Sequence, residues 1–289
     1  MNEFEIDKKA VRRAFSKAAT QYDAAAVMQR EVCIRMLERL DYIKQKPNTV
    51  LDVGSGTGWG TRQLGERYPD AQIVALDIAI GMLQASRGTA SWWSKLFAGN
   101  ARQYVCADME ALPIRANSMD MLWSNLAVQW CNDLPATLIE LHKVLKVDGL
   151  LMFSTFGPDT LKELRTAFQG VDGHNHLNRF ADMHDIGDML VAGGFADPVM
   201  DMEYITLTYD DVKGVMQDLR SIGAHNATAG RSSGMMGKHA WAKVLENYER
   251  LRSNGKLPTT FEVIYGHAWK PQPKKIDDGR AIIKTTFKL

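Results

Sequence analysis

The sequence predicts an α/β fold in which helices cover both faces of a mostly parallel sheet of seven strands. From residue 47 onward, short apolar runs alternate with helix-length segments, a pattern that favours right-handed β-α-β units. A glycine-rich loop directly follows the first of these runs, where open α/β sheets place their ligands. The 289 residues are 45% hydrophobic and 24% charged, which suits a globular protein with a large core and excludes a disordered or fibrous chain.

The expected elements follow one another along the chain. Residues 8–45 carry apolar side chains at helical spacing, uninterrupted by glycine or proline until Pro47, and predict one or two amphipathic helices. Helix-start signals include Asp133 as an N-cap and Pro158 in a first turn. The expected strands are 49–53, 72–76, 103–107, 119–124, 150–155, 199–207 and 259–269. Later helices are expected at 134–145, 159–168, 182–192, 210–222 and 238–252.

Composition divides the chain into an N-terminal helical segment, 1–46, and a sheet domain, 47–270. Within the sheet domain, the helical stretch 209–256 interrupts the sheet before its last strand. Residues 271–289 begin with two closely spaced prolines and scattered charge, which predicts a flexible tail.

The overall charge excludes a chain-wide surface for nucleic acid or anionic membrane, because 35 Lys and Arg balance 34 Asp and Glu. The balance is uneven along the chain: 47–211 holds 11 basic and 21 acidic residues, whereas 212–256 holds 8 basic and 3 acidic. The basic segment is either an ordinary solvated helix surface or a patch that faces a partner.

Three scattered cysteines, without Cys-x-x-Cys spacing, favour a reducing compartment and give no reason to expect a metal site. The start of the chain is acidic where a signal peptide would be basic, and no apolar run approaches a membrane span. We therefore expect a cytoplasmic protein.

The glycine loop is the strongest motif: Val50-Leu-Asp-Val-Gly54-Ser-Gly56-Thr-Gly58. Glycine at alternate positions permits positive φ and close approach of the backbone to a ligand. Trp59 and Thr61 stand where a dinucleotide fingerprint needs its last glycine, and no triphosphate-binding G-x-x-x-x-G-K-[S/T] occurs. Hydride transfer and nucleotide hydrolysis therefore lose their main support.

With Asp52 just before it, this loop resembles the first motif of class I S-adenosylmethionine (SAM)-dependent methyltransferases, which implies their Rossmann-like fold. The resemblance places the loop against the methionine part of SAM, with Asp52 helping to hold the ammonium group. Asp77 and Asp108 end the next two strands, where the family contacts the ribose and the adenine. The implied cofactor residues are Asp52, Gly54, Ser55, Gly56, Gly58, Asp77, Ile78, Met82, Asp108, Met109, Asn125 and Leu126.

From about residue 7 to 270 the chain resembles the malonyl-acyl-carrier-protein O-methyltransferases of biotin synthesis, the BioC family. The segments that carry this resemblance are 11–23, 123–130, 178–180, 219–224 and 257–260. It implies methylation of the free carboxylate of a malonyl thioester, an early step of pimeloyl synthesis, with segment 1–46 as a lid. A carboxylate is already ionised at pH 7, so an orienting cation is expected and a general base is not.

Arg179 is the leading candidate for that cation, and a structural salt bridge to Asp182 or Asp185 is the alternative. Tyr22 is expected to close over the cofactor and contact substrate, unless it only packs a helix against the sheet.

The carrier is an acidic protein in this family, so the basic insertion is expected to dock it. The docking candidates are Arg220, Arg231, Lys238 and Lys243. Two other functions stay open: methylation of another small carboxylic acid or quinone, and a SAM-binding assembly role without turnover.

Overall fold

The computed structural model describes residues 5–88, 102–171, 178–221 and 236–273. Within these residues, seven strands form one sheet in the order β3-β2-β1-β4-β5-β7-β6. Strands β1 to β5 pair in parallel, and β7 runs antiparallel between β5 and β6, so the expected mostly parallel sheet is confirmed. The strands are β1 (Thr49–Val53), β2 (Gln72–Asp77), β3 (Gln103–Cys106), β4 (Met119–Asn125), β5 (Leu145–Phe156), β6 (Ala196–Tyr209) and β7 (Leu257–Trp269).

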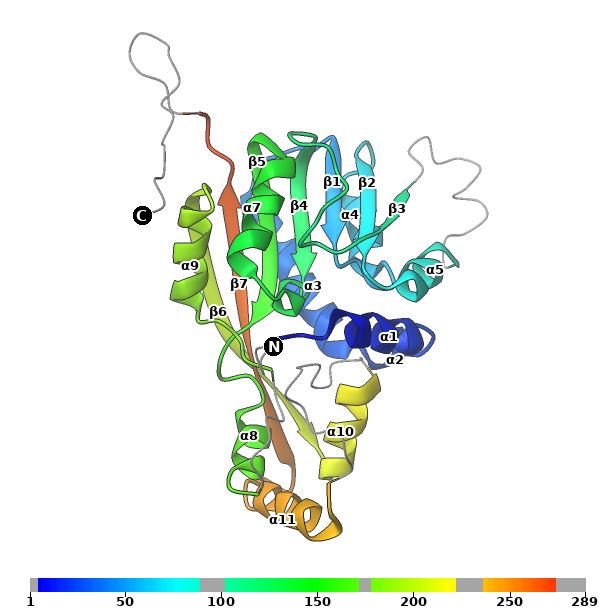
Figure 1. Ribbon diagram of the computed structural model, residues 1–289, viewed down its shortest axis with the longest axis vertical. Helices are drawn as coiled ribbons and strands as arrows, with labels where there is room; N and C mark the ends of the chain where they lie inside the picture. Colours follow the sequence, from blue (N-terminus) through cyan, green and yellow to red (C-terminus); the bar gives the residue numbers. More distant parts are fainter. Residues whose placement is uncertain (1–4, 89–101, 172–177, 222–235, 274–289) are drawn as a thin grey trace.

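Helices cover both faces of this sheet (Figure 1). The helices are α1 (Lys8–Ala18), α2 (Tyr22–Ala25), α3 (Val27–Arg39), α4 (Trp59–Arg67), α5 (Ile80–Gly88), α7 (Leu134–Val144), α8 (Lys162–Phe168), α9 (Met183–Ala192), α10 (Val212–Ser221) and α11 (Lys238–Glu249). Two short 3-10 turns, η1 (Leu40–Tyr42) and η2 (Val128–Trp130), follow α3 and β4.

The alternation of side chains along the strands separates two apolar cores. Val50 of β1 faces one core together with α3 and α4, while its neighbour Leu51 faces the other, with α7 and α9. In β4, Trp123 lies in the first core and Leu122 in the second. Both layers are buried, which holds the strand ends rigidly in relation to one another.

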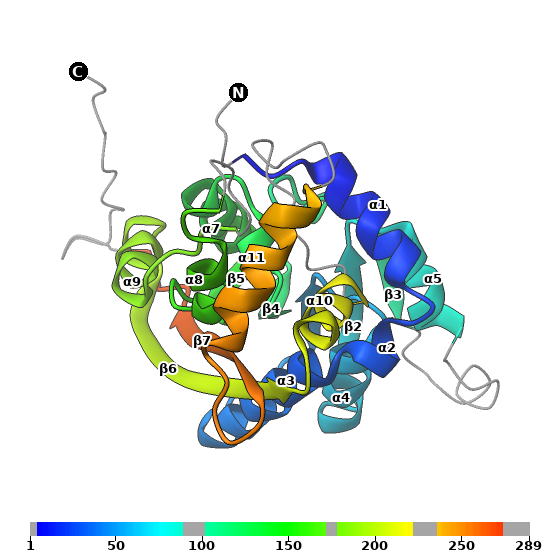
Figure 2. The ribbon, with the colours of Figure 1, turned by 90° about the horizontal axis from the view of Figure 1, so that it is seen from below.

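The N-terminal helices α1 and α2 lie beneath the edge at which β1, β2 and β4 end (Figure 1). Strand β7 pairs with β5 only through Trp269–Val263, and its first residues continue beside β6 alone. This two-stranded extension leads away from the sheet, and α8, α10 and α11 gather around it (Figures 1 and 2). Helices α10 and α11 come between β6 and β7 in the chain, where the sequence places the insertion.

Several boundaries differ from the expected ones, and two of these differences have a local cause in the backbone. The N-terminal segment forms three helical pieces, and α2 is separated from α3 because the backbone leaves the helical region at Ala26. Helix α8 begins at Lys162 instead of residue 159, because Leu161 adopts a left-handed φ of 57°. Leu161 N donates to Thr260 O of β7 at 2.7 Å. This contact with the sheet delays the helix beyond the start that Pro158 predicted.

Candidate active site

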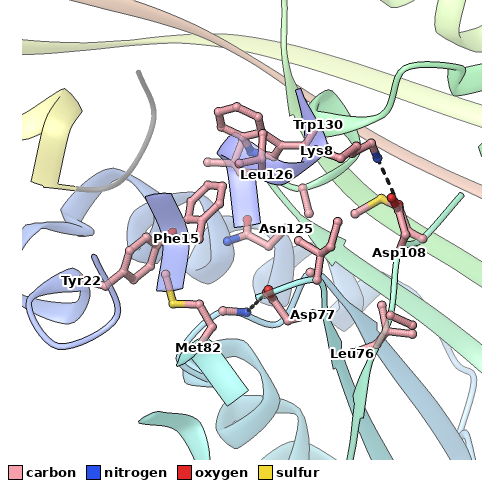
Figure 3. Close-up of a pocket in the computed structure, with 17 residues that line it drawn as sticks. Lys8, Phe15, Tyr22, Leu76, Asp77, Met82, Asp108, Asn125, Leu126 and Trp130 are labelled. Atoms are coloured by element: carbon pink, nitrogen blue, oxygen red, sulfur yellow. Dashed lines mark hydrogen bonds and ion pairs between the residues drawn. The ribbon is translucent and has the colours of Figure 1, made fainter. Parts of the chain in front are cut away.

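Two neighbouring cavities, of about 630 and 480 Å³, open at the edge where β1, β2 and β4 end. Tyr22, Gly54, Gly56 and Asn125 line both, so the cavities meet at the glycine loop. The first extends between α1 and the ends of β2 and β3 (Figure 3), and the second extends toward α3 and Asp52. These volumes include space that is open to solvent.

The glycine loop is held against the end of β2. The N–H groups of Gly54 and Ser55 both donate to Leu76 O, at 2.7 and 2.9 Å. Gly54 has a φ of +76°, and a Cβ placed there would lie 2.3 Å from the Cβ of Ala127. Close packing and positive φ therefore both require glycine at this position.

Gly58 serves the loop differently. It lines neither cavity, caps α4 with a φ of +77°, and a Cβ there would lie 2.0 Å from Ser86 Oγ. The structure thus gives Gly58 a role in turning the chain into α4, and the contact with SAM that the resemblance implies for it stays a prediction. Every other cofactor residue expected from the sequence lines one or both cavities.

Asp77 connects the ends of β1 and β2. Its buried carboxylate accepts hydrogen bonds from Gly56 N at 2.9 Å and from Ala79 N at 2.7 Å. Burial raises the pKa of Asp77 to about 6, although both hydrogen bonds oppose that shift. The carboxylate therefore fixes the glycine loop and still presents acceptor capacity to the first cavity.

Asp52 lies at the floor of the second cavity and accepts a hydrogen bond from Thr61 Oγ1 at 2.5 Å. Burial raises the pKa of Asp52 to about 7, and the charge of Asp77 adds to this effect. A cation bound nearby would favour the ionised form.

Three buried polar atoms around the second cavity have no hydrogen-bond partner in the described part of the chain: Gln29 Oε1, Ser55 Oγ and Trp123 Nε1. Buried polar groups are normally satisfied, so such a cluster indicates a polar ligand. Arg30 also lines this cavity, opposite in charge to Asp52. The second cavity therefore contains acceptors that suit a ligand ammonium and donors that suit a ligand carboxylate.

Asn125 ends β4 between the two cavities. Its Nδ2 donates to Gln29 O at 2.9 Å, and its Oδ1 accepts from Ser154 Oγ at 2.9 Å. Leu126 follows with a left-handed φ of 49°, held by bonds from its N–H to Ser154. Strained backbone of this kind is concentrated at functional sites.

The wall of the first cavity opposite Asp77 is apolar (Figure 3). Phe15 of α1 packs edge-on against Trp130, with ring centroids 5.2 Å apart, and lies 6.4 Å from Tyr22. Burial, followed by the charges of Asp77 and Asp23, raises the pKa of Tyr22, so its hydroxyl stays protonated at neutral pH.

Lys8 of α1 closes the other end of this cavity. Its Nζ lies 3.0 Å from Asp108 Oδ1 (Figure 3) and 3.0 Å from Glu110 Oε2. The contact joins the N-terminal segment to the acid that ends the third strand. The sequence patterns did not indicate Lys8, Gln29 or Arg30, since nothing local marks a helix residue that lines a cavity at distant strand ends; Lys8 and Asp108, for example, are 100 positions apart.

The expected substrate and docking residues lie outside the cavities. Arg179 is exposed and lines neither, although its neighbour Phe180 packs on Phe156 at the end of β5. Arg220, Lys238 and Lys243 are exposed on α10 and α11, and Arg231 lies outside the described residues.

The described residues contain no group of three His, Cys, Asp or Glu side chains able to hold a metal ion. None of their helices is long and apolar enough to cross a membrane.

The fold is shared with solved structures of low sequence identity. The YcgJ protein of Bacillus subtilis superposes with a TM-score of 0.58 at 14% identity, covering 82% of this chain and 98% of that one. An arsenic(III) S-adenosylmethionine methyltransferase from Chlamydomonas reinhardtii gives a TM-score of 0.50 at 16% identity, covering 80% and 65%. At such identities the likeness shows the fold alone.

Sequence comparisons are more specific. A family model described as a methyltransferase domain matches residues 51–153. The malonyl-acyl-carrier-protein O-methyltransferase of Gallionella capsiferriformans is 72% identical over 289 residues, which cover 100% of both chains. The enzyme of the same name from Nitrosospira multiformis is 60% identical over 93% of this chain and 91% of its own length. The chain therefore belongs to the family of malonyl-acyl-carrier-protein O-methyltransferases.

Proposed function

We propose that this enzyme transfers the methyl group of SAM to the free carboxylate of malonyl-acyl carrier protein, giving the methyl ester and S-adenosylhomocysteine. The observation that carries the proposal is the pair of connected cavities, one with acids at two strand ends and the other with unpartnered buried polar atoms. The activity named for the full-length relatives supports the choice of substrate.

The polar groups of both cavities fit SAM. Asp77 would accept from the ribose hydroxyls and Asp108 from the adenine amino group. In the second cavity, Asp52 and Gln29 Oε1 suit the ammonium of the methionine part.

The carboxylate of the methionine part needs donors, and the same cavity supplies them. Trp123 Nε1, Ser55 Oγ and the Arg30 guanidinium are all suited to it. When bound, SAM supplies a methyl group attached to a positively charged sulfur.

The chain's own contribution is alignment in a site from which water is excluded. The attacking carboxylate is ionised at neutral pH, so no residue has to remove a proton. Phe15, Trp130 and Leu126 form an apolar wall, which suits a reaction in which opposite charges are neutralised as the bond forms. Tyr22, with its raised pKa, is suited to donate a hydrogen bond and not to act as a base.

Arg179 remains our proposed anchor for the malonyl carboxylate. Its neighbour Phe180 holds this segment against the end of β5, at the same edge of the sheet as the cavities. The exposed Arg220, Lys238 and Lys243 remain the proposed docking surface of the insertion, and segment 1–46 the proposed lid.

Transfer of labelled methyl from SAM to malonyl-, succinyl- and acetyl-carrier protein tests this function. The proposal expects a base-labile label on the malonyl form and none on the acetyl form, which lacks a free carboxylate. Labelling of an amine, or of none of the carboxylates, would overturn it. SAM binding without any transfer would favour an assembly role.

A further inference from the structure

Helix α1 has two chemically different faces. Lys8, Val11 and Phe15 line the first cavity, at the spacing of one helix face. Lys9, Arg13 and Lys17 recur every fourth residue and, at 100° per residue, point directly away from that face. We call these three residues, with the adjacent Arg12, the α1 basic stripe.

The positive charges of the α1 basic stripe are exposed and lie without acidic partners among the described residues. All four side chains are exposed, and none forms an ion pair within the described part of the chain. Helix α1 itself contains no acidic residue. From Lys9 to Lys17 the stripe spans about 12 Å, enough to meet several carboxylates on one partner.

This concentration of charge is not required for folding. The basic residues that follow α11 are different, since Arg250 pairs with Glu246 and Arg252 with Glu249 in the ordinary manner of a solvated helix. Four like charges on one short helix repel each other, so the α1 basic stripe costs stability unless an anionic surface faces it.

We propose that the α1 basic stripe is a docking surface for the acidic acyl carrier protein, in addition to the surface proposed on the insertion. The inference rests on the proposed function, because it takes the carrier-bound malonyl thioester as the substrate. A tethered thioester reaches only a cavity whose mouth lies near the docking surface, and α1 lies beneath the sheet edge where that cavity opens (Figures 1 and 2). One helix thereby presents the carrier's contact surface on its outer side and closes the methyl-transfer site on its inner side.

Docking on α1 also connects the carrier to the cofactor. The Lys8 side chain holds α1 to Asp108 and Glu110 at 3.0 Å. A carrier that orders α1 from outside would stabilise this closed arrangement, so carrier binding and SAM binding should each strengthen the other.

The test is the triple variant Lys9→Gln, Arg13→Gln and Lys17→Gln, assayed with malonyl-carrier protein and with a small malonyl thioester. We expect KM for the carrier substrate to rise about tenfold, as for the loss of several exposed charge pairs, with KM for the small thioester unchanged. The salt dependence of the carrier KM should weaken in parallel.

Two matched comparisons locate the surface. Lys44→Gln, Lys46→Gln and Arg115→Gln remove the same charge from exposed positions before β1 and β4, at the opposite edge of the sheet, and should change neither KM. Lys238→Glu with Lys243→Glu probes the insertion. If only the insertion variant weakens the carrier substrate, the α1 proposal is wrong.

The other outcomes also decide the question. An equal loss on both substrates would mean that the triple variant disturbs the cavity and would overturn the docking proposal, as would no loss on either. A stripe variant that loses affinity for anionic vesicles but keeps its carrier KM would assign the stripe to a membrane instead.

Failure of the proposed function looks different, because the wild-type enzyme would then methylate neither substrate. Calorimetric binding of the carrier protein would still test the α1 basic stripe in that case. Equal affinity of the wild-type and triple-variant proteins, or no binding by either, would overturn it.

Discussion

Replacement of Asp77 by Asn separates the two roles of this buried carboxylate. The side chain keeps its shape but loses its charge and one of two acceptor oxygens, which now receive N–H groups from Gly56 and Ala79. A carboxylate that accepts from both ribose hydroxyls contributes about 1.5–3 kcal/mol per bond. We therefore expect the Kd for SAM to rise about a hundredfold.

The stability of the ligand-free protein should change in a pH-dependent way. Burial raises the pKa of Asp77 from 3.8 to about 6, so the folded protein binds this proton more tightly than the unfolded chain does. Wild-type stability therefore falls as pH rises through this range, by about 3 kcal/mol for a shift of this size. The amide that replaces the carboxyl group cannot titrate. The difference in the free energy of unfolding between Asp77→Asn and the wild type should therefore shift by that amount in favour of the variant as the pH rises from 4 to 7.

Urea unfolding at several pH values and calorimetry with SAM measure the two effects. Asp120→Asn is the matched control at the opposite edge of the sheet. Partial burial raises the pKa of Asp120, but hydrogen bonds from Lys146 and Thr49 outweigh this effect and lower it. Its loss of stability should instead be greatest at neutral pH, with SAM affinity unchanged. Unchanged SAM affinity in Asp77→Asn, or a stability difference independent of pH, would refute the reasoning.

Three further outcomes are expected. Gly54→Ala should weaken SAM binding at least tenfold in calorimetry, and adding Ala127→Gly should restore only part of it, because the clash is relieved but the φ of +76° remains strained; full restoration would contradict this. SAM affinity should fall as pH drops through about 7, where burial places the pKa of Asp52, and Asp52→Asn should bind weakly at every pH; a pH-independent wild-type Kd would argue against the ammonium contact. Arg179→Ala should raise KM for the malonyl substrate or lower kcat while SAM binding persists, whereas loss of SAM binding would make Arg179 structural.

The sequence was sufficient for the sheet, and all but one of the cofactor residues that it predicts line the two cavities. Asp52, Asp77 and Asp108 each lie at or just beyond the end of a parallel strand, and parallel strands bring such ends to one edge whatever covers them. Gly54 and Gly56 could also be predicted to form the loop, because its positive φ angles favour glycine.

Contacts between residues that are far apart in the sequence could not be predicted. Lys8 meets Asp108, and Gln29 meets Asn125, through a helical segment whose docking on the sheet edge no local pattern specifies. The motif gives all its glycines one role, whereas packing against Ser86 and the turn into α4 also require glycine at position 58. The predicted start of α8 was wrong for a similar reason, since the conformation of Leu161 is determined by its hydrogen bond to β7.

The most direct measurement of the central claim uses SAM carrying a carbon-13 methyl group and malonyl-carrier protein as the acceptor. NMR of the product should show one new O-methyl ester signal on the malonyl group, removed by mild base, and none when acetyl-carrier protein is supplied. An N-methyl or C-methyl signal, or an unlabelled malonyl group after complete incubation with active enzyme, would contradict carboxylate methylation.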